Sequence, residues 1–141
     1  ATQAGTAVAK LHAPGLNVMW ADAAGNIAWW AAAKLPVRPA HVRPYLLLDG
    51  STGADDPTGW LPFPQNPQSL NPEHGVLFSA NNQPDDAGTG LVPGYYMAGD
   101  RARRIEQLLF AEKKDWTPDA VRTVVNDVTN PQFPLLLKDL L

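Results

Sequence analysis

The chain has 141 residues and a mass of 15.2 kDa, which suits one domain with its own core over residues 1–141. An apolar fraction of 45% excludes a disordered polyelectrolyte, and a formal net charge of −3 argues against a broad nucleic-acid-binding surface. The absence of cysteine excludes disulfides, thiolate nucleophiles and cysteine-ligated metal sites. The 14 prolines and 11 glycines exceed the usual share and predict short elements joined by ordered turns.

The first part of the chain is predicted to be a short helix followed by a β-hairpin. Apolar residues at helical spacing indicate a helix over residues 3–12. The runs 17–21 and 26–31 are typical of strands. Asp22 and Gly25 lie between them, and they predict a tight turn. Aspartate bonds the backbone two residues on, and glycine adopts the positive φ that such a turn requires.

The middle of the chain, residues 36–74, combines most of the prolines with many apolar side chains. Proline removes a backbone donor and fixes φ, so this composition disfavours long helices and central strands. We therefore expect an ordered, packed loop rather than a flexible linker. Beyond it the sequence predicts a strand over 76–80, a loop over 83–94, a helix from residue 100, a second from Thr117 to Asn130 and a third over 134–141.

The order of these elements indicates an α+β fold with an antiparallel sheet and packed helices. No alternation of strand, helix and strand occurs, and no internal repeat is visible. Within the single domain we expect three parts. They are a helix tail over 1–16, a hairpin with the proline-rich loop and a strand over 17–82, and a helical end over 98–141.

Motif chemistry taken by itself indicates no catalytic centre. The histidines are far apart and have no metal-ligand spacing, so they are expected to be solvated loop residues. Adjacent carboxylates occur twice in loops, where surface turns use them more often than calcium ligation or acid–base catalysis does. A glycine-rich phosphate loop and a G-x-S-x-G nucleophile motif are both absent. The residues concerned are His12, His41 and His74 and the pairs Asp55-Asp56 and Asp85-Asp86.

Several short stretches nevertheless occur in a distinctive order. They are Asn17-Val-Met-Trp-Ala-Asp22-Ala-Ala-Gly25-Asn26-Ile27, Gly59-Trp60-Leu61-Pro62-Phe63, Asn71-Pro72-Glu73-His74-Gly75, Ala80-Asn81-Asn82 and Asp100-Arg101. From about Asn17 to Leu109 this series resembles the penicillin amidase (penicillin acylase) family, in the middle to late part of its large β subunit. The hairpin stretch followed by the asparagine-rich stretches is specific, whereas each one alone would be weak.

The resemblance implies an N-terminal-nucleophile hydrolase with an αββα sandwich, which cleaves linear amides such as penicillin or similar N-acyl substrates. In this family a precursor cuts itself and frees a serine, whose own α-amino group acts as general base. The present sequence begins with Ala1. We therefore expect a fragment of the β subunit that lacks the nucleophile and is inactive by itself. The family implies a periplasmic or extracellular location for the parent protein.

The resemblance also assigns two site residues. Asn81 matches the asparagine whose side chain donates to the oxyanion hole, and Arg101 matches the arginine that opens the following helix near the active site. Two alternatives remain open. The pair Asn81-Asn82 also suits a turn after a strand, because asparagine tolerates left-handed backbone conformations. Arg101 also suits a solvated position among its basic neighbours.

The resemblance implies no required cofactor. The family has a calcium site, but no aspartate in the loop after Asn82 clearly matches its ligand position. The implied partners are the α subunit and the N-terminal part of the β subunit, with a small N-acyl amide as substrate and neither nucleic acid nor membrane. Exposed sheet edges are expected to favour self-association.

The alternatives to this function are a fragment of an acyl-homoserine-lactone acylase and a non-catalytic, tryptophan-rich binding or assembly module. We expect Trp20, Trp29, Trp30 and Trp60 to be core and loop anchors rather than an acyl pocket.

Overall fold

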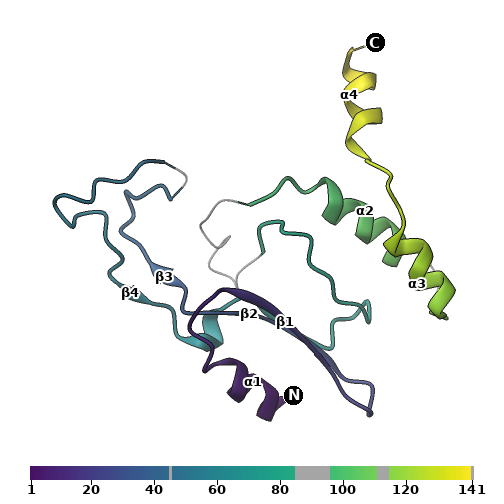
Figure 1. Cartoon of the computed structure of the whole chain (residues 1–141), viewed down its shortest axis with the longest axis horizontal. Coiled ribbons are helices and arrows are strands. Elements are labelled where there is room, and N and C mark those ends of the chain that lie inside the picture. The colour runs from purple at the N-terminus through teal and green to yellow at the C-terminus, as the bar shows by residue number, and fades with distance from the viewer. Residues whose placement is uncertain (45, 85–95, 111–114, 141) are drawn as a thin grey trace. The chain divides into compact units, whose positions relative to one another are not determined.

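The computed structural model describes residues 1–44, 46–84, 96–110 and 115–140 (Figure 1). The chain divides into two compact units, of which the first contains Ala1–Leu77 and the second contains Phe78–Asn82 and Tyr96–Leu141. The first unit holds α1 (Thr2–Val8), β1 (Leu16–Ala21), β2 (Ile27–Ala32), β3 (Pro36–Val37), β4 (Gly59–Trp60), the 3₁₀ helix η1 (Phe63–Gln65) and β5 (Gln68–Leu70). The second holds α2 (Asp100–Leu109), α3 (Pro118–Val125) and α4 (Gln132–Leu140).

The predicted hairpin is confirmed. Strands β1 and β2 pair antiparallel, with a register that runs from Leu16 opposite Ala32 to Ala21 opposite Ile27. The turn uses the chemistry expected of it. One carboxylate oxygen of Asp22 accepts hydrogen bonds from the backbone N–H groups of Ala24 and Asn26, both at 2.9 Å. Gly25 adopts φ +85°, a conformation that a residue with a Cβ rarely adopts.

A third strand joins the sheet, and the sequence did not predict it. Strand β5 pairs antiparallel with β2, which gives the order β1-β2-β5. Pro67 immediately precedes this strand and Pro72 follows it closely, which is why the segment was expected to be a loop. The strand forms nevertheless because it lies at the edge of the sheet, where the missing donors of nearby prolines disrupt no central ladder. The β3–β4 pair forms a separate two-stranded sheet within the same proline-rich stretch.

Helix α1 lies beside the hairpin and contacts β2 (Figure 1). The core of the first unit consists of Val8 from α1 and alternate residues of β2, Ala28, Trp30 and Ala32. This alternation follows from the two-residue period of a strand, which places successive side chains on opposite faces. The helix is shorter than the predicted span of 3–12, because only a turn continues the chain beyond Val8.

The predicted strand over 76–80 is not present in the structure. These residues follow the turn at Gly75, which has φ +68°, and no sheet ladder includes them. An apolar run supplies the burial that a strand needs but does not supply a partner strand, so it produces a packed, irregular segment that ends at buried Ala80. The predicted loop over 83–94 falls mostly on residues outside the part of the chain that the structure describes.

The three predicted helices of the second unit are all present. Thr117 caps α3, since its Oγ1 accepts a hydrogen bond from the N–H of Ala120 at 3.2 Å, and Pro118 occupies the first helical position. Helix α3 ends at Val125, earlier than the predicted end at Asn130, and α4 begins two residues before the predicted start. The valines and leucines expected to pack are largely exposed in this chain: Val121, Val125, Val128, Leu135, Leu136, Leu137 and Leu140.

The fold is therefore a mixture of helices with small antiparallel sheets, as the α+β prediction states. Among the described residues, no helix is long and apolar enough to cross a membrane.

Candidate functional site

Asn81 occupies a sharp bend in the second unit. Its φ is +61°, in the left-handed region that asparagine tolerates better than most residues with a side chain. Its backbone carbonyl accepts a hydrogen bond from the N–H of Met97 at 3.0 Å, and the preceding residue, Ala80, is 1% exposed. The backbone thus has the conformation that the turn alternative requires. A turn residue can still carry a functional side chain, and the amide of Asn81 is exposed to solvent.

Arg101 lies in the first turn of α2, and its side chain reaches Asn81. The distance from Nη1 of Arg101 to Oδ1 of Asn81 is 3.3 Å. A guanidinium group can only donate hydrogen bonds, so the atom of Asn81 that faces it must be the carbonyl oxygen. The Nδ2 group is therefore directed away from Arg101, and within the described residues it has no hydrogen-bond partner. The structure brings together the two residues that the resemblance assigned to the site.

The start of α2 is held mainly by groups on neighbouring segments. Gly99 precedes the helix and offers no side-chain cap, while Asp100 places a carboxylate in the first turn, where the helix dipole favours negative charge. The Nδ2 group of Asn130 lies 3.5 Å from Oδ2 of Asp100. At the other end of α2, the ring of Phe110 packs edge-to-face on Phe78, with centroids 6.3 Å apart. The segment that carries Asn81 is thus attached to α2 at both Phe78 and Asn81.

A bidentate ion pair anchors the middle of α2, and the sequence did not predict it. Nε and Nη2 of Arg104 donate to the two carboxylate oxygens of Asp127 at 3.0 and 2.7 Å. The hydrogen bond from Arg104 is the main cause that lowers the pKa of Asp127 from 3.8 to about 2. The same hydrogen bond raises the pKa of Arg104. The two residues are 23 positions apart, Arg104 on α2 and Asp127 in the segment that follows α3, and no local motif marks either one.

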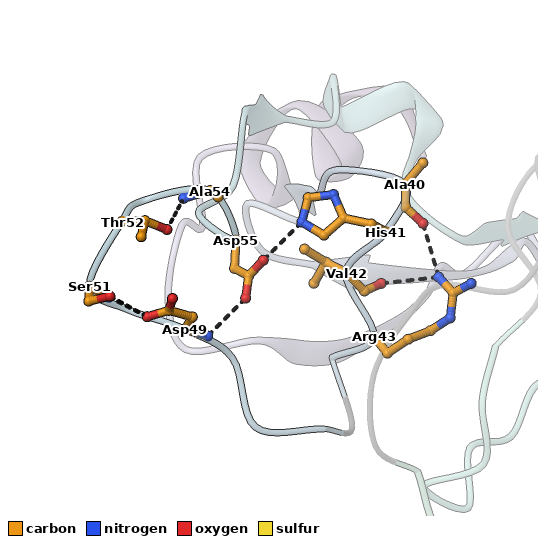
Figure 2. A network of polar contacts seen from close by, with 9 residues as sticks. All are labelled: Ala40, His41, Val42, Arg43, Asp49, Ser51, Thr52, Ala54 and Asp55. Carbon is orange, nitrogen blue, oxygen red and sulfur yellow. Dashed lines mark hydrogen bonds and ion pairs between the residues drawn. The ribbon is translucent and has the colours of Figure 1, made fainter.

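A second polar cluster holds the loop between residues 40 and 55 (Figure 2). One carboxylate oxygen of Asp55 lies 2.9 Å from Nε2 of His41, and the other accepts the backbone N–H of Asp49 at 2.8 Å. These two hydrogen bonds, that from Asp49 first, lower the pKa of Asp55. Ser51 donates through both N and Oγ to Asp49, whose pKa is lowered as a result. The carboxylates here bond to their own loop, which is a structural role.

His41 is therefore paired with Asp55 rather than simply solvated as expected, although its side chain is 62% exposed. Asp85-Asp86 lie outside the described residues. Over the described part of the chain, no group of three or more histidine, aspartate or glutamate side chains is placed to hold a metal ion.

The first unit also has an open groove of about 460 Å³ between α1 and the sheet. Its walls are mostly apolar and include Trp30, Phe63 and Leu70, with Thr2 and Gln68 as polar members. The lining contains no histidine, carboxylate or lysine side chain. The groove can therefore accept an apolar group but has no side chain suited to acid–base chemistry.

Trp20 and Trp30 contribute to the core as expected, whereas Trp60 is largely exposed. Trp30 is 6% exposed in the core of the first unit, and Trp20 packs against that core. On the opposite face of the sheet, Nε1 of Trp29 donates to Oδ1 of Asn17 at 2.9 Å. Trp60 is 55% exposed at the end of β4.

Comparisons with known proteins identify the family of this chain. The family model described as penicillin amidase matches residues 1–141. The chain is 32% identical over 124 residues to penicillin G acylase of Escherichia coli, and this match covers 86% of the chain. It is 30% identical over 126 residues to penicillin acylase 2 proenzyme of Pseudomonas sp. (strain SE83), covering 85% of the chain. The chain therefore belongs to the penicillin amidase family.

A solved structure shows the same relationship. A thermostable penicillin G acylase from Alcaligenes faecalis matches with a TM-score of 0.70 and 26% identity over 88% of the chain. The match covers only 22% of that structure's chain, and the two curated relatives are covered to 14% and 15%. The 141 residues thus correspond to a small part of each homologue.

Proposed function

We propose that this chain is the part of an N-terminal-nucleophile amide hydrolase that supplies one donor of the oxyanion hole, Asn81, held in orientation by Arg101. The observation that carries the proposal is the 3.3 Å contact from Nη1 of Arg101 to Oδ1 of Asn81. This contact directs Nδ2 of Asn81 away from the arginine, so that its N–H groups are available to an external acceptor.

The proposed chemistry is acyl transfer from a linear amide. A nucleophilic serine, supplied by a segment beyond these 141 residues, attacks the amide carbon, and the carbonyl oxygen becomes an oxyanion in the tetrahedral intermediate. Nδ2 of Asn81 donates to that oxyanion. Because Oδ1 is already bonded to Arg101, the amide need not reorient when the charge develops, which is the condition under which such donors are most effective.

The proposed partner is the rest of the acylase polypeptide, namely the α subunit and the N-terminal part of the β subunit. Three observations support this. The homologues are several times longer than this chain, and the helices α3 and α4 expose apolar side chains such as Val125 and Leu140. Asn81 and Arg101 are also exposed here. A partner that covers them would exclude water and strengthen the hydrogen bond to an oxyanion. In the same proposal, α1 and the three-stranded sheet contribute to an αββα sandwich.

The test is made in the full-length acylase that contains this chain. Asn81→Gly removes the amide but suits the left-handed backbone, so it isolates the side chain's role. We expect kcat for a chromogenic phenylacetyl amide to fall about 10²–10³-fold, the usual effect of losing one oxyanion donor. Asn71→Gly is the matched control, because Asn71 is also left-handed, with φ +46°, but bonds to Ile27 in the hairpin. It should lower thermal stability and leave kcat unchanged.

An unchanged kcat in Asn81→Gly would contradict the oxyanion role. Acyl-homoserine lactones, tested beside the phenylacetyl amide, identify the acyl and amine preference. Failure of the full-length protein to hydrolyse any N-acyl amide would favour the binding-module alternative.

A further inference from the structure

We propose that Asp127 is a positioning residue for this reaction. Through its ion pair with Arg104, it fixes the rotation of α2 that keeps Arg101 on Asn81. The inference rests on the function proposed above and assigns a role to a residue that touches neither the substrate nor the reacting atoms.

The ion pair is well suited to fix a rotation. Two parallel N–H to oxygen bonds, at 3.0 and 2.7 Å, fix direction as well as distance, unlike a single contact. The side chains are only 27% and 17% exposed for Arg104 and Asp127 respectively. The carboxylate is itself held, because Oδ1 of Asp127 accepts the N–H of Thr129 at 3.0 Å. The guanidinium group is thus bound to a rigid acceptor.

The position of Arg104 on the helix links the pair to the site. Residues three apart lie on the same side of an α-helix, so Arg101 and Arg104 are neighbours on one side of α2. A rotation of α2 about its axis would therefore move both guanidinium groups together. Holding Arg104 at Asp127 restricts this rotation, and the buried side chain of Ala102 between them also limits how far the helix can shift.

The ion pair also removes a competitor for Asn81. Arg104 belongs to a run of arginines on α2, and Oδ1 of Asn81 would attract any of them within reach. The free arm of Arg104, Nη1, donates to Oε1 of Gln107 at 3.3 Å, while its other nitrogens are bound to Asp127. Every nitrogen of this guanidinium therefore has a partner, so Arg104 does not compete with Arg101 for the amide of Asn81.

The experiment is a double-mutant cycle in the full-length acylase. Asp127→Asn keeps the shape of the side chain but removes its charge and one acceptor. We expect kcat to fall roughly tenfold, less than the 10² that a full displacement of a catalytic group can cost. The inhibition constant of phenylacetate, which reports ground-state binding, should stay unchanged. In an Asn81→Gly background, Asp127→Asn should cause no further loss of kcat, because the group that it positions is gone.

Two further variants keep the test decisive. Asp119→Asn breaks an exposed ion pair to Arg122 on α3 at 3.0 Å and should leave kcat unchanged. If Asp127→Asn folds poorly, the exchanged pair Arg104→Asp with Asp127→Arg should recover both folding and kcat. Recovery supports the proposal that the Arg104–Asp127 ion pair fixes α2. An exchanged pair that folds but has a low kcat contradicts it.

The two proposals can fail separately. An equal loss from Asp127→Asn with and without Asn81 would mean a general structural role and would overturn this inference alone. The inference alone is also overturned if Asn81→Gly lowers kcat and Asp127→Asn does not. A fully active Asn81→Gly variant would overturn the proposed function, and the inference with it.

Discussion

Arg101 donates a hydrogen bond to the side-chain oxygen of Asn81, twenty positions earlier in the chain, and this contact joins the first turn of α2 to a left-handed bend. The family resemblance assigns each residue to the site without predicting that the two are in contact. Their direct contact explains why an asparagine and an arginine occur at these two positions. Asn81 needs a donor to define which end of its amide faces outward, and Arg101 is a donor that never accepts.

Replacing Arg101 should therefore weaken catalysis without weakening substrate binding. We expect Arg101→Ala to lower kcat roughly tenfold or more with little change in KM, because the amide of Asn81 would lose its fixed orientation. Arg103→Ala is the control, since Arg103 is an exposed arginine two positions further along α2. Steady-state kinetics of the full-length protein measure both. A rise in KM with kcat unchanged would instead indicate that Arg101 binds the substrate.

The 141-residue chain alone should not hydrolyse phenylacetyl, phenoxyacetyl or acyl-homoserine-lactone amides. It contains the proposed oxyanion donor but spans only 14% and 15% of the two curated relatives, and the proposed mechanism assigns the nucleophile to another part of the acylase. The measurement is product release by the purified chain over many hours. Hydrolysis that survives repeated purification and disappears in Asn81→Ala would show that the nucleophile lies within these residues.

The Arg104–Asp127 pair predicts a particular response to acid. The pKa of Asp127 is about 2 in the folded chain and 3.8 without its partners. Because the folded value is the lower one, the unfolded state takes up the proton first as the pH falls. The stabilisation by Asp127 is therefore complete above about pH 5 and disappears progressively between about pH 4 and 2.

Urea denaturation at pH 6 and pH 2.5 measures this effect. Asp127→Asn should be less stable than the unmodified chain at pH 6, and the difference in stability should be much smaller at pH 2.5. Asp119→Asn, in its exposed pair on α3, should differ little from the unmodified chain at either pH. A stability difference as large at pH 2.5 as at pH 6 would assign the effect of Asp127→Asn to packing rather than to charge.

Among the described residues, Asn66 is a buried polar residue that joins the proline-rich segment to the end of β2. It is 1% exposed, and its Nδ2 donates to the carbonyls of Ala31 and Ala33, both at 2.9 Å. Asn66→Ala should lower the free energy of unfolding by about 1–3 kcal/mol, because buried carbonyls lose their donor. Asn66→Asp should be worse, since a carboxylate would face two carbonyl oxygens. Denaturation by urea measures both, and equal stability of the two variants would contradict this account.

Gly25 offers a simpler test of the hairpin turn. A Cβ there would meet no atom within 4 Å, so Gly25→Ala should be destabilising only through its φ of +85°, by about 1–2 kcal/mol. Gly50→Ala is the control, because Gly50 is equally unobstructed and lies outside the left-handed region. If both variants are equally stable, the turn has relaxed to another conformation.

How much the sequence predicts depends on how local the cause is. The hairpin was predicted because Asp22 and Gly25 determine their turn with neighbouring atoms only. The strand β5 was missed because its partner, β2, lies some forty residues earlier, and pairing there outweighs the local effect of proline. The expected strand over 76–80 failed for the converse reason, since it has apolar residues but no partner strand.

How far the candidate site can be predicted also depends on how local the cause is. Asn81 and Arg101 were identified through family resemblance, because nothing in the spacing of the two residues predicts their contact. Asp127 could not be found from sequence at all. Its role depends on Arg104, which lies on α2, 23 positions earlier, and arginine and aspartate are too common on surfaces for either to be distinctive.

The hydrogen bond from the N–H of Met97 to the carbonyl of Asn81 has a consequence for the rigidity of the proposed site. It attaches the backbone of Asn81 to the segment just before α2, while Arg101, in the first turn of that helix, bonds to its side chain. Both the backbone and the side chain of Asn81 are therefore tied to the chain that enters α2, which restricts the amide to one orientation.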